Sequence, residues 1–65
     1  MVTNYLKKAI DDYVSHHARL PEFINISPYE HEKLLYELNR DFGEQIREIY
    51  GVKVNIRFDQ SYRFR

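Results

Sequence analysis

The sequence contains no cysteine and no tryptophan, and its 65 residues include only two glycines and two prolines. Without cysteine the chain has neither disulfides nor thiolate metal sites, which often stabilise very small folds. Two glycines are too few for a glycine-rich loop of the kind that binds nucleotide phosphates. Ten acidic and ten basic side chains cancel, which excludes a general polycation or polyanion.

Long apolar runs are also missing. No stretch approaches the roughly 18 apolar residues of a membrane span, and the start does not have the pattern of a signal peptide. We therefore expect a cytoplasmic protein with no membrane partner. The hydrophobic content of 43% and the aromatic content of 15% indicate a folded chain, and its length predicts a single domain over residues 1–65.

The first third of the chain predicts a helix and a strand. Apolar residues spaced three and four apart predict a helix from about Asn4 to His17. Thr3 or Asn4 is expected to cap its start, and Pro21 follows its end. Phe23–Ile26 is short and β-branched, which is typical of a strand.

A second helix has the clearest boundary in the sequence. Ser27-Pro28-Tyr29-Glu30 combines a capping serine, a proline at the first helical position and a glutamate three residues after the cap. Apolar residues keep helical spacing beyond this start, which predicts one helix over residues 28–50 with Gly51 as its C-terminal cap. A break at Gly43 is the alternative, because glycine costs about 1 kcal/mol inside a helix.

The C-terminal part reads as two strands. Apolar and polar residues alternate from Val52 to Phe58, Asp59-Gln60-Ser61 can turn, and Tyr62–Arg65 repeats the alternation, which predicts a hairpin. A strand, a helix and a strand in one sheet imply a parallel, right-handed crossover. The sequence therefore predicts a small two-layer α/β (α+β) domain in the order α-β-α-β-β. Both helices are expected on one face of a short mixed sheet.

The chain has three histidines, which are its candidate imidazole ligands for a metal. His17 and His31 fall within the apolar arcs of the two helices, where they could bind a metal with Glu30, Glu32 or His16. A structural role is favoured: His17 can bond free carbonyls in a last helical turn, and His31 stands in a first turn near the surface. Their spacing matches no metal-binding motif, so we expect no metal and no cofactor.

Catalytic nucleophiles are scarce. The hydroxyl candidates include Ser27, which is used by its cap, Ser61 in a turn and Thr3 at the start. Most carboxylates stand three or four residues from a cation on a helix, as in Lys33 and Glu37. We expect no enzymatic activity and no small-molecule substrate.

One face of the second helix combines aromatic and basic side chains in a stripe about 60° wide, with an acidic stripe beside it. Large rings and arginines are typical of interface hot spots. A solvated helix face with neutralising charge pairs is the alternative interpretation. The predicted partner-binding residues are Tyr29, Lys33, Tyr36, Arg40 and Arg47.

Charge is divided unevenly along the chain. Residues 51–65 hold four cations and one acid, a local +3, and residues 1–50 hold six cations and nine acids, a local −3. In the predicted hairpin Arg57, Arg63 and Arg65 would share the outer face of the sheet. Such a face can take phosphates, which makes nucleic-acid binding the alternative function; it can also protect a sheet edge from aggregation.

The apolar content exceeds what one small core can enclose. Twenty-eight of the 65 residues, or 43%, are hydrophobic, and a two-layer domain of this size leaves part of them exposed. We therefore expect a homo-oligomer, such as a dimer, or a protein partner that covers the remainder.

The segment from Leu20 to Pro28, followed by Tyr29, Leu34 and Leu35, resembles small orphan proteins of phages and other bacterial mobile elements. In these proteins a short strand runs into a Ser-Pro helix start, and Gly51–Val54 fits the same pattern. Capsid proteins of tailed phages have a similar step, but this chain is far too short to be one. The resemblance implies a small cytosolic protein that binds and modulates a host or phage protein.

Overall fold

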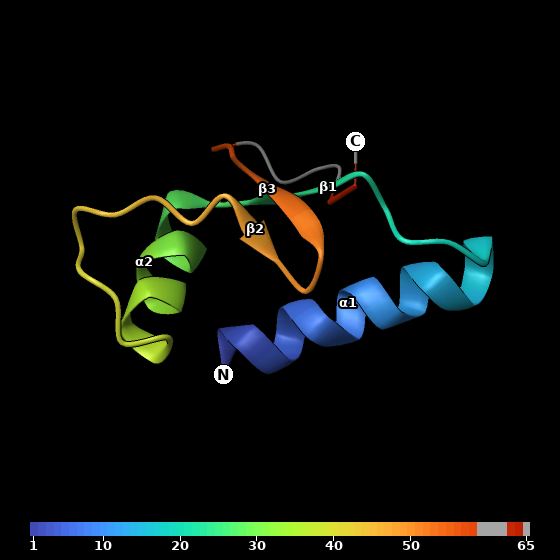
Figure 1. The fold of residues 1–65 in the computed structure, drawn as a ribbon, viewed down its shortest axis with the longest axis horizontal. Coiled ribbons are helices and arrows are strands. Elements are labelled where there is room, and N and C mark those ends of the chain that lie inside the picture. Colours follow the sequence, from blue (N-terminus) through green and yellow to red (C-terminus); the bar gives the residue numbers. More distant parts are fainter. Residues whose placement is uncertain (59–62, 65) are drawn as a thin grey trace.

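The computed structural model describes residues 1–58 and 63–64. It contains five elements in the predicted order of helix, strand, helix, strand and strand (Figure 1). They are α1 (Val2–His17), β1 (Phe23–Ile26), α2 (Pro28–Glu37), β2 (Glu48–Ile49) and β3 (Val52–Ile56). The predicted α+β class is confirmed.

The three strands form one mixed sheet in the order β1-β3-β2. β1 pairs in parallel with the central strand, with Ile24 opposite Val54, and β2 pairs with it antiparallel, with Ile49 opposite Val52. The parallel pair confirms the prediction that a crossover containing α2 joins two strands of one sheet.

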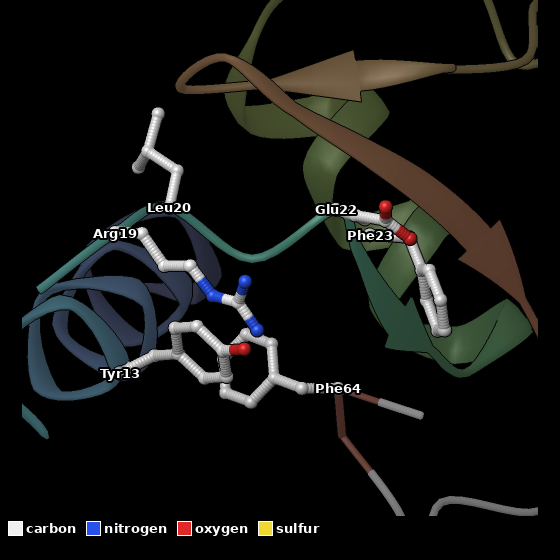
Figure 2. A pocket seen from close by; sticks show the side chains of 6 residues that line it. All are labelled: Tyr13, Arg19, Leu20, Glu22, Phe23 and Phe64. Atoms are coloured by element: carbon white, nitrogen blue, oxygen red, sulfur yellow. The ribbon is translucent and has the colours of Figure 1, made fainter. Parts of the chain in front are cut away.

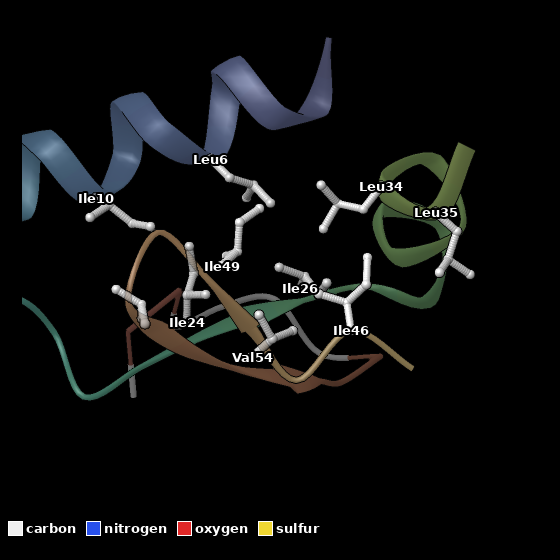
Figure 3. Close-up of a cluster of buried hydrophobic side chains, with 10 residues drawn as sticks. Leu6, Ile10, Ile24, Ile26, Leu34, Leu35, Ile46, Ile49 and Val54 are labelled. Atoms are coloured by element: carbon white, nitrogen blue, oxygen red, sulfur yellow. The ribbon is translucent and has the colours of Figure 1, made fainter. Parts of the chain in front are cut away.

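Both helices pack against the sheet through a small apolar core. Figure 3 shows Leu6 and Ile10 of α1 pointing toward side chains of the sheet, with α2 contributing Leu34 and Leu35 at one end. Side chains alternate along β3, so Val52 and Val54 are buried while the residue between them is exposed. Among the described residues, the buried hydrophobic core consists of Leu6, Ile10, Ile24, Ile26, Leu34, Leu35, Ile46, Ile49, Val52 and Val54.

The predicted extent of the second helix is wrong. α2 begins at Pro28 as expected but ends at Glu37, well before Gly43 and Tyr50. Asn39 adopts a left-handed conformation with φ 59°, which stops the helix. The apolar residues beyond this point no longer share one buried face: Phe42 is 70% exposed, whereas Ile46 is buried. The helical spacing after Glu37 therefore does not reflect a helix.

Gly51 has a different role from the predicted helix cap. Tyr50 and Gly51 have φ angles of 51° and 79°, and they join β2 to β3 as a two-residue hairpin loop. Two successive positive φ angles are the signature of a type I′ turn, whose twist matches that of antiparallel strands.

α1 begins two residues earlier than predicted, at Val2, and neither Thr3 nor Asn4 caps it. The caps come instead from α2, because the Glu37 carboxylate accepts the N–H groups of Val2 (2.8 Å) and Thr3 (2.9 Å). The Thr3 hydroxyl donates to the same carboxylate at 2.9 Å. One side chain therefore closes the start of α1 and joins the two helices.

Of the strand predicted over Tyr62–Arg65, Arg63 and Phe64 are described, and neither lies in a strand; Tyr62 and Arg65 lie outside the described residues. At Arg63, which is described, the predicted pairing beside β3 is wrong: the Arg63 carbonyl accepts the N–H of Asn25 in β1 at 2.6 Å. Because β3 is already flanked by β1 and β2, Arg63 lies along the other edge of β1.

Candidate interaction surface

The predicted stripe begins on α2. Tyr29, Lys33 and Tyr36 are spaced by four and three residues, so they lie on one side of the helix. Their side chains are exposed, Tyr29 by 66% and Tyr36 by 75%. The Lys33 ammonium is 5.4 Å from the centroid of the Tyr29 ring, a cation–π contact. This part of the stripe is present as predicted.

Arg40 joins these residues although the helix has already ended. The left-handed Asn39 reverses the chain, and the Arg40 N–H donates to the Leu35 carbonyl at 2.8 Å. The Arg40 guanidinium forms an exposed ion pair with Glu44 at 3.1 Å. The turn after α2 thus keeps Arg40 beside Tyr36.

Together with the start of α1, this turn encloses a hollow of about 530 Å³. Its large apolar side chains are highly exposed: Met1 by 79%, Tyr36 by 75% and Phe42 by 70%. We name this surface the Tyr36 patch; its lining residues are Met1, Tyr36, Glu37, Asn39, Arg40 and Phe42.

Arg47 does not belong to this surface. It precedes β2, and its carbonyl accepts the Val54 N–H at 2.9 Å. Its neighbours around a separate hollow of about 480 Å³ include Glu48 and Lys53. The five predicted residues are therefore divided between two places. Tyr29, Lys33 and Tyr36 lie on α2 and Arg40 lies in the turn after it, whereas Arg47 lies beside the sheet.

The basic C-terminal residues are also divided. Arg57 and Phe58 are exposed just after β3, Phe58 by 92%, and Arg65 lies outside the described residues. Arg63 is tied into the fold: its guanidinium donates to both carboxylate oxygens of Glu30 at 3.0 and 3.2 Å. It also donates to the Asn25 carbonyl at 2.9 Å.

The Arg63–Glu30 pair is largely shielded from solvent, with 19% and 13% of the side chains exposed. Burial raises the pKa of Glu30, but hydrogen bonds from Arg63 and Ser27 and the charge of Arg63 outweigh it, so this pKa lies below its usual value. Burial lowers the pKa of Arg63, and the bonds and charge of Glu30 raise it above its usual value. Both groups are held in their charged forms.

Glu30 also completes the cap that the sequence predicts. Its backbone N–H donates to the Ser27 hydroxyl at 3.0 Å, and its carboxylate accepts the Ser27 N–H at 2.9 Å. This reciprocal pair is a capping box, so one carboxylate both closes the start of α2 and binds Arg63.

A third hollow, of about 340 Å³, lies where α1 ends and β1 begins. Figure 2 shows the rings of Tyr13 and Phe64 side by side with Arg19 extending toward them, while Leu20 points away. The Tyr13 and Phe64 centroids are 4.8 Å apart, and the Tyr13 ring also contacts His17 at 4.1 Å.

The histidines have structural contacts, but different ones from those predicted. His31 is buried rather than near the surface, and its Nε2 accepts the Ile46 N–H at 2.9 Å. Nδ1 of His16 lies 2.8 Å from the Asp12 carbonyl oxygen, and His17 packs on Tyr13. Among the described residues, no group of three or more histidine or carboxylate side chains could hold a metal ion.

Sequence reasoning missed two contributors to these surfaces. The helical spacing over residues 28–50 includes Phe42 in the apolar face of one long helix, and the sequence pairs Glu37 with Lys33 on the same helix. The left-handed Asn39 exposes Phe42, and Glu37 bonds α1 instead. An asparagine that tolerates positive φ was the available signal for the first change.

In the described part of the chain, no helix is long and apolar enough to cross a membrane. Comparison with protein-family models, with curated proteins and with solved structures finds no match.

Proposed function

We propose that this chain is a small non-catalytic protein-binding module that modulates a partner by occupying its surface. The observation that carries the proposal is the Tyr36 patch, where three large apolar side chains, each at least 70% exposed, surround one hollow beside Arg40. Exposed apolar area of this kind favours association, because burial is worth about 25 cal/mol per Å².

The patch also has the composition that binding surfaces use. Aromatic rings supply large contact areas with few rotatable bonds, and arginine adds directional hydrogen bonds. Tyr29 and Lys33 continue this composition along α2, so a partner that lies along the helix would contact both groups. We propose that the partner-binding residues are Tyr29, Lys33, Tyr36 and Arg40, with Arg47 outside the central contact.

The proposed setting follows from the resemblance of the strand-to-helix segment to small proteins of phages and mobile elements. Such proteins act in the cytoplasm on a host or phage protein. The exposed aromatic surface supports the binding role, since a modulator that works by occupying its partner's surface needs an exposed contact area rather than a catalytic cleft. Self-association through the same surface is part of the proposal.

The experiment is affinity purification from the native cell, comparing the wild type with Tyr36→Ala/Arg40→Ala. Loss of both side chains should weaken partner binding by about 2 kcal/mol, the hot-spot scale. Arg57→Ala/Phe58→Ala is the matched control, because it removes an exposed arginine and an exposed ring elsewhere. Unchanged recovery of the partner with the first variant contradicts the proposal.

Nucleic-acid binding is the second candidate, and the exposed pair of Arg57 and Phe58 favours it. A cation and a ring side by side suit a phosphate and a stacked base. Arg63 contributes less, since its guanidinium is bound to Glu30, and Arg65 would add a further charge. Affinity that falls steeply with salt, and that Arg57→Ala/Phe58→Ala abolishes, would identify this function.

A further inference from the structure

The residues Arg63 and Phe64, here called the tail, bind to a site built from distant parts of the chain. The Arg63 carbonyl accepts the Asn25 N–H at 2.6 Å, and the Arg63 guanidinium donates to the Asn25 carbonyl at 2.9 Å. The tail therefore lies along the edge of β1 that faces away from β3.

This site recognises the arginine in several ways at once. Glu30 binds both terminal nitrogens of the guanidinium, the geometry that distinguishes arginine from lysine. The guanidinium carbon lies 5.4 Å from the centroid of the Tyr5 ring, and Nη2 is 3.3 Å from the Tyr5 hydroxyl. A carboxylate, a ring and a backbone carbonyl thus converge on one cation.

A separate part of the site takes the aromatic residue. The centroid of the Phe64 ring lies 4.8 Å from that of the Tyr13 ring, beside the hollow at the end of α1 (Figure 2). Phe64 also packs against the edge of the apolar core. We name Tyr5, Tyr13, Asn25 and Glu30 the tail-binding site; it fits an arginine followed by an aromatic residue.

The site and the tail are separable parts of the molecule. The site lies within residues 5–30, and its hydrogen bonds to Arg63 span 33 to 58 positions of sequence. β3, from which the chain continues toward the tail, pairs with the opposite edge of β1. The contacts themselves therefore do not require that the tail and the site belong to the same copy.

Charge favours the same contact between copies. Residues 1–50 carry −3 and residues 51–65 carry +3, so the body of one copy attracts the C-terminal part of another. After one tail has crossed, the reciprocal contact forms within the same complex, which makes the second exchange intramolecular. Such an arrangement closes with two-fold symmetry.

We propose that the tail-binding site accepts the Arg63–Phe64 tail of a second copy of this chain, so that two copies exchange tails. The proposal is independent of the Tyr36 patch, which lies at the other end of α1. Exchange competes with the copy's own tail, whose effective concentration is on the order of millimolar for a short connection. Dimers therefore increase with protein concentration.

The test mixes two full-length variants. Glu30→Gln weakens the site but keeps a side chain that can complete the capping box, and Arg63→Gln weakens the tail but leaves the site intact. Only the mixture offers an intact tail to an intact site, so we expect it to associate at least about tenfold more tightly than either variant alone, a difference of about 1.4 kcal/mol. Because the chain lacks cysteine, a Lys8→Cys label on each variant allows energy transfer to report pairing.

A second measurement uses the wild type, so it remains decisive if a variant fails to fold. Labelled and unlabelled copies are mixed at high concentration, and magnetisation transfer between the rings of Tyr13 and Phe64 on different copies is sought. Its presence, retained in Tyr36→Ala/Arg40→Ala, supports exchange independently of the proposed function. Exclusively intramolecular transfer, or a mixture no tighter than its components, overturns the proposal.

Discussion

The two helices satisfy the free N–H groups of their first turns in different ways. α2 uses a local capping box between Ser27 and Glu30, three positions apart. α1 has no cap of its own and relies on Glu37, at the far end of α2. The start of α2 can therefore form from neighbouring residues, whereas the start of α1 is complete only after both helices have packed together.

The two carboxylates also differ in what else they hold. The Glu30 side chain is 13% exposed and binds the guanidinium of Arg63, which in turn donates to Asn25 of β1, so the ion pair connects α2, β1 and the tail. Glu37 accepts three hydrogen bonds from Val2 and Thr3 near the surface. We infer that Glu30 stabilises the whole fold, whereas Glu37 mainly orders one end of α1.

The largest expected effect is that of Glu30→Ala. The variant loses its half of the capping box and leaves Arg63 partly buried without its partner, so we expect the free energy of unfolding to fall by about 3 kcal/mol. Urea unfolding followed by circular dichroism measures the change. Glu30→Gln keeps the box and should lose about half as much; a Glu30→Gln variant as stable as the wild type would show that the ion pair contributes nothing.

Acidification should act on both carboxylates. The pKa of Glu37 lies below its usual value, mainly because its carboxylate accepts the hydrogen bond of the Thr3 N–H. Partial burial raises this pKa, whereas the hydrogen bonds from the Val2 N–H and the Thr3 hydroxyl lower it further. The pKa of Glu30 is lowered as well. Folded carboxylates with lowered pKa values stabilise the protein fully above the unfolded pKa, and this stabilisation is lost as pH falls through the folded values.

Urea midpoints measured from about pH 7 to about pH 3 should therefore decrease. The decrease should be smaller in Glu30→Gln, which has already lost one of the two titrating groups. Parallel curves for the wild type and this variant would contradict the assignment of acid sensitivity to Glu30.

The smallest expected effect is that of Glu37→Ala, and it should be local. Without the carboxylate the first turn of α1 loses its cap, so amide hydrogen exchange at Tyr5 and Leu6 should accelerate while exchange in β1 changes little. Glu32→Ala, which removes an exposed glutamate from the same helix, is the control. Uniform acceleration across the chain would mean that Glu37 supports the whole fold after all.

Features set by neighbouring residues were predictable from the sequence. Ser27-Pro28-Tyr29-Glu30 placed the start of α2 correctly because a capping box depends on residues three positions apart. The alternation in β3 and the parallel crossover followed from equally short-range patterns. In the same way Tyr29, Lys33 and Tyr36 share a helix face as predicted.

Features decided by tertiary contact were not predictable. The helical spacing through Ile46 and Ile49 continued past the true end of α2, because both residues reach the core from a loop and from β2 rather than from a helix. The His31–Ile46 hydrogen bond, across 15 positions, stabilises that path. No local pattern indicates that Arg63 would bind Glu30 rather than solvent.

One signal was present but was interpreted wrongly. In the sequence Ile49-Tyr50-Gly51-Val52, two apolar residues flank Tyr50 and Gly51. This pattern fits a two-residue hairpin loop as well as a helix end. The hairpin interpretation would have ended the helix earlier and would have placed Arg47 at the sheet.

One of the two edge strands of the sheet, β2, is only two residues long, and its exposed residue is the charged Glu48. So short a strand presents too few main-chain groups to template the growth of a fibre. The molecule can thus display Tyr36 and Phe42 to solvent while its sheet resists open-ended polymerisation.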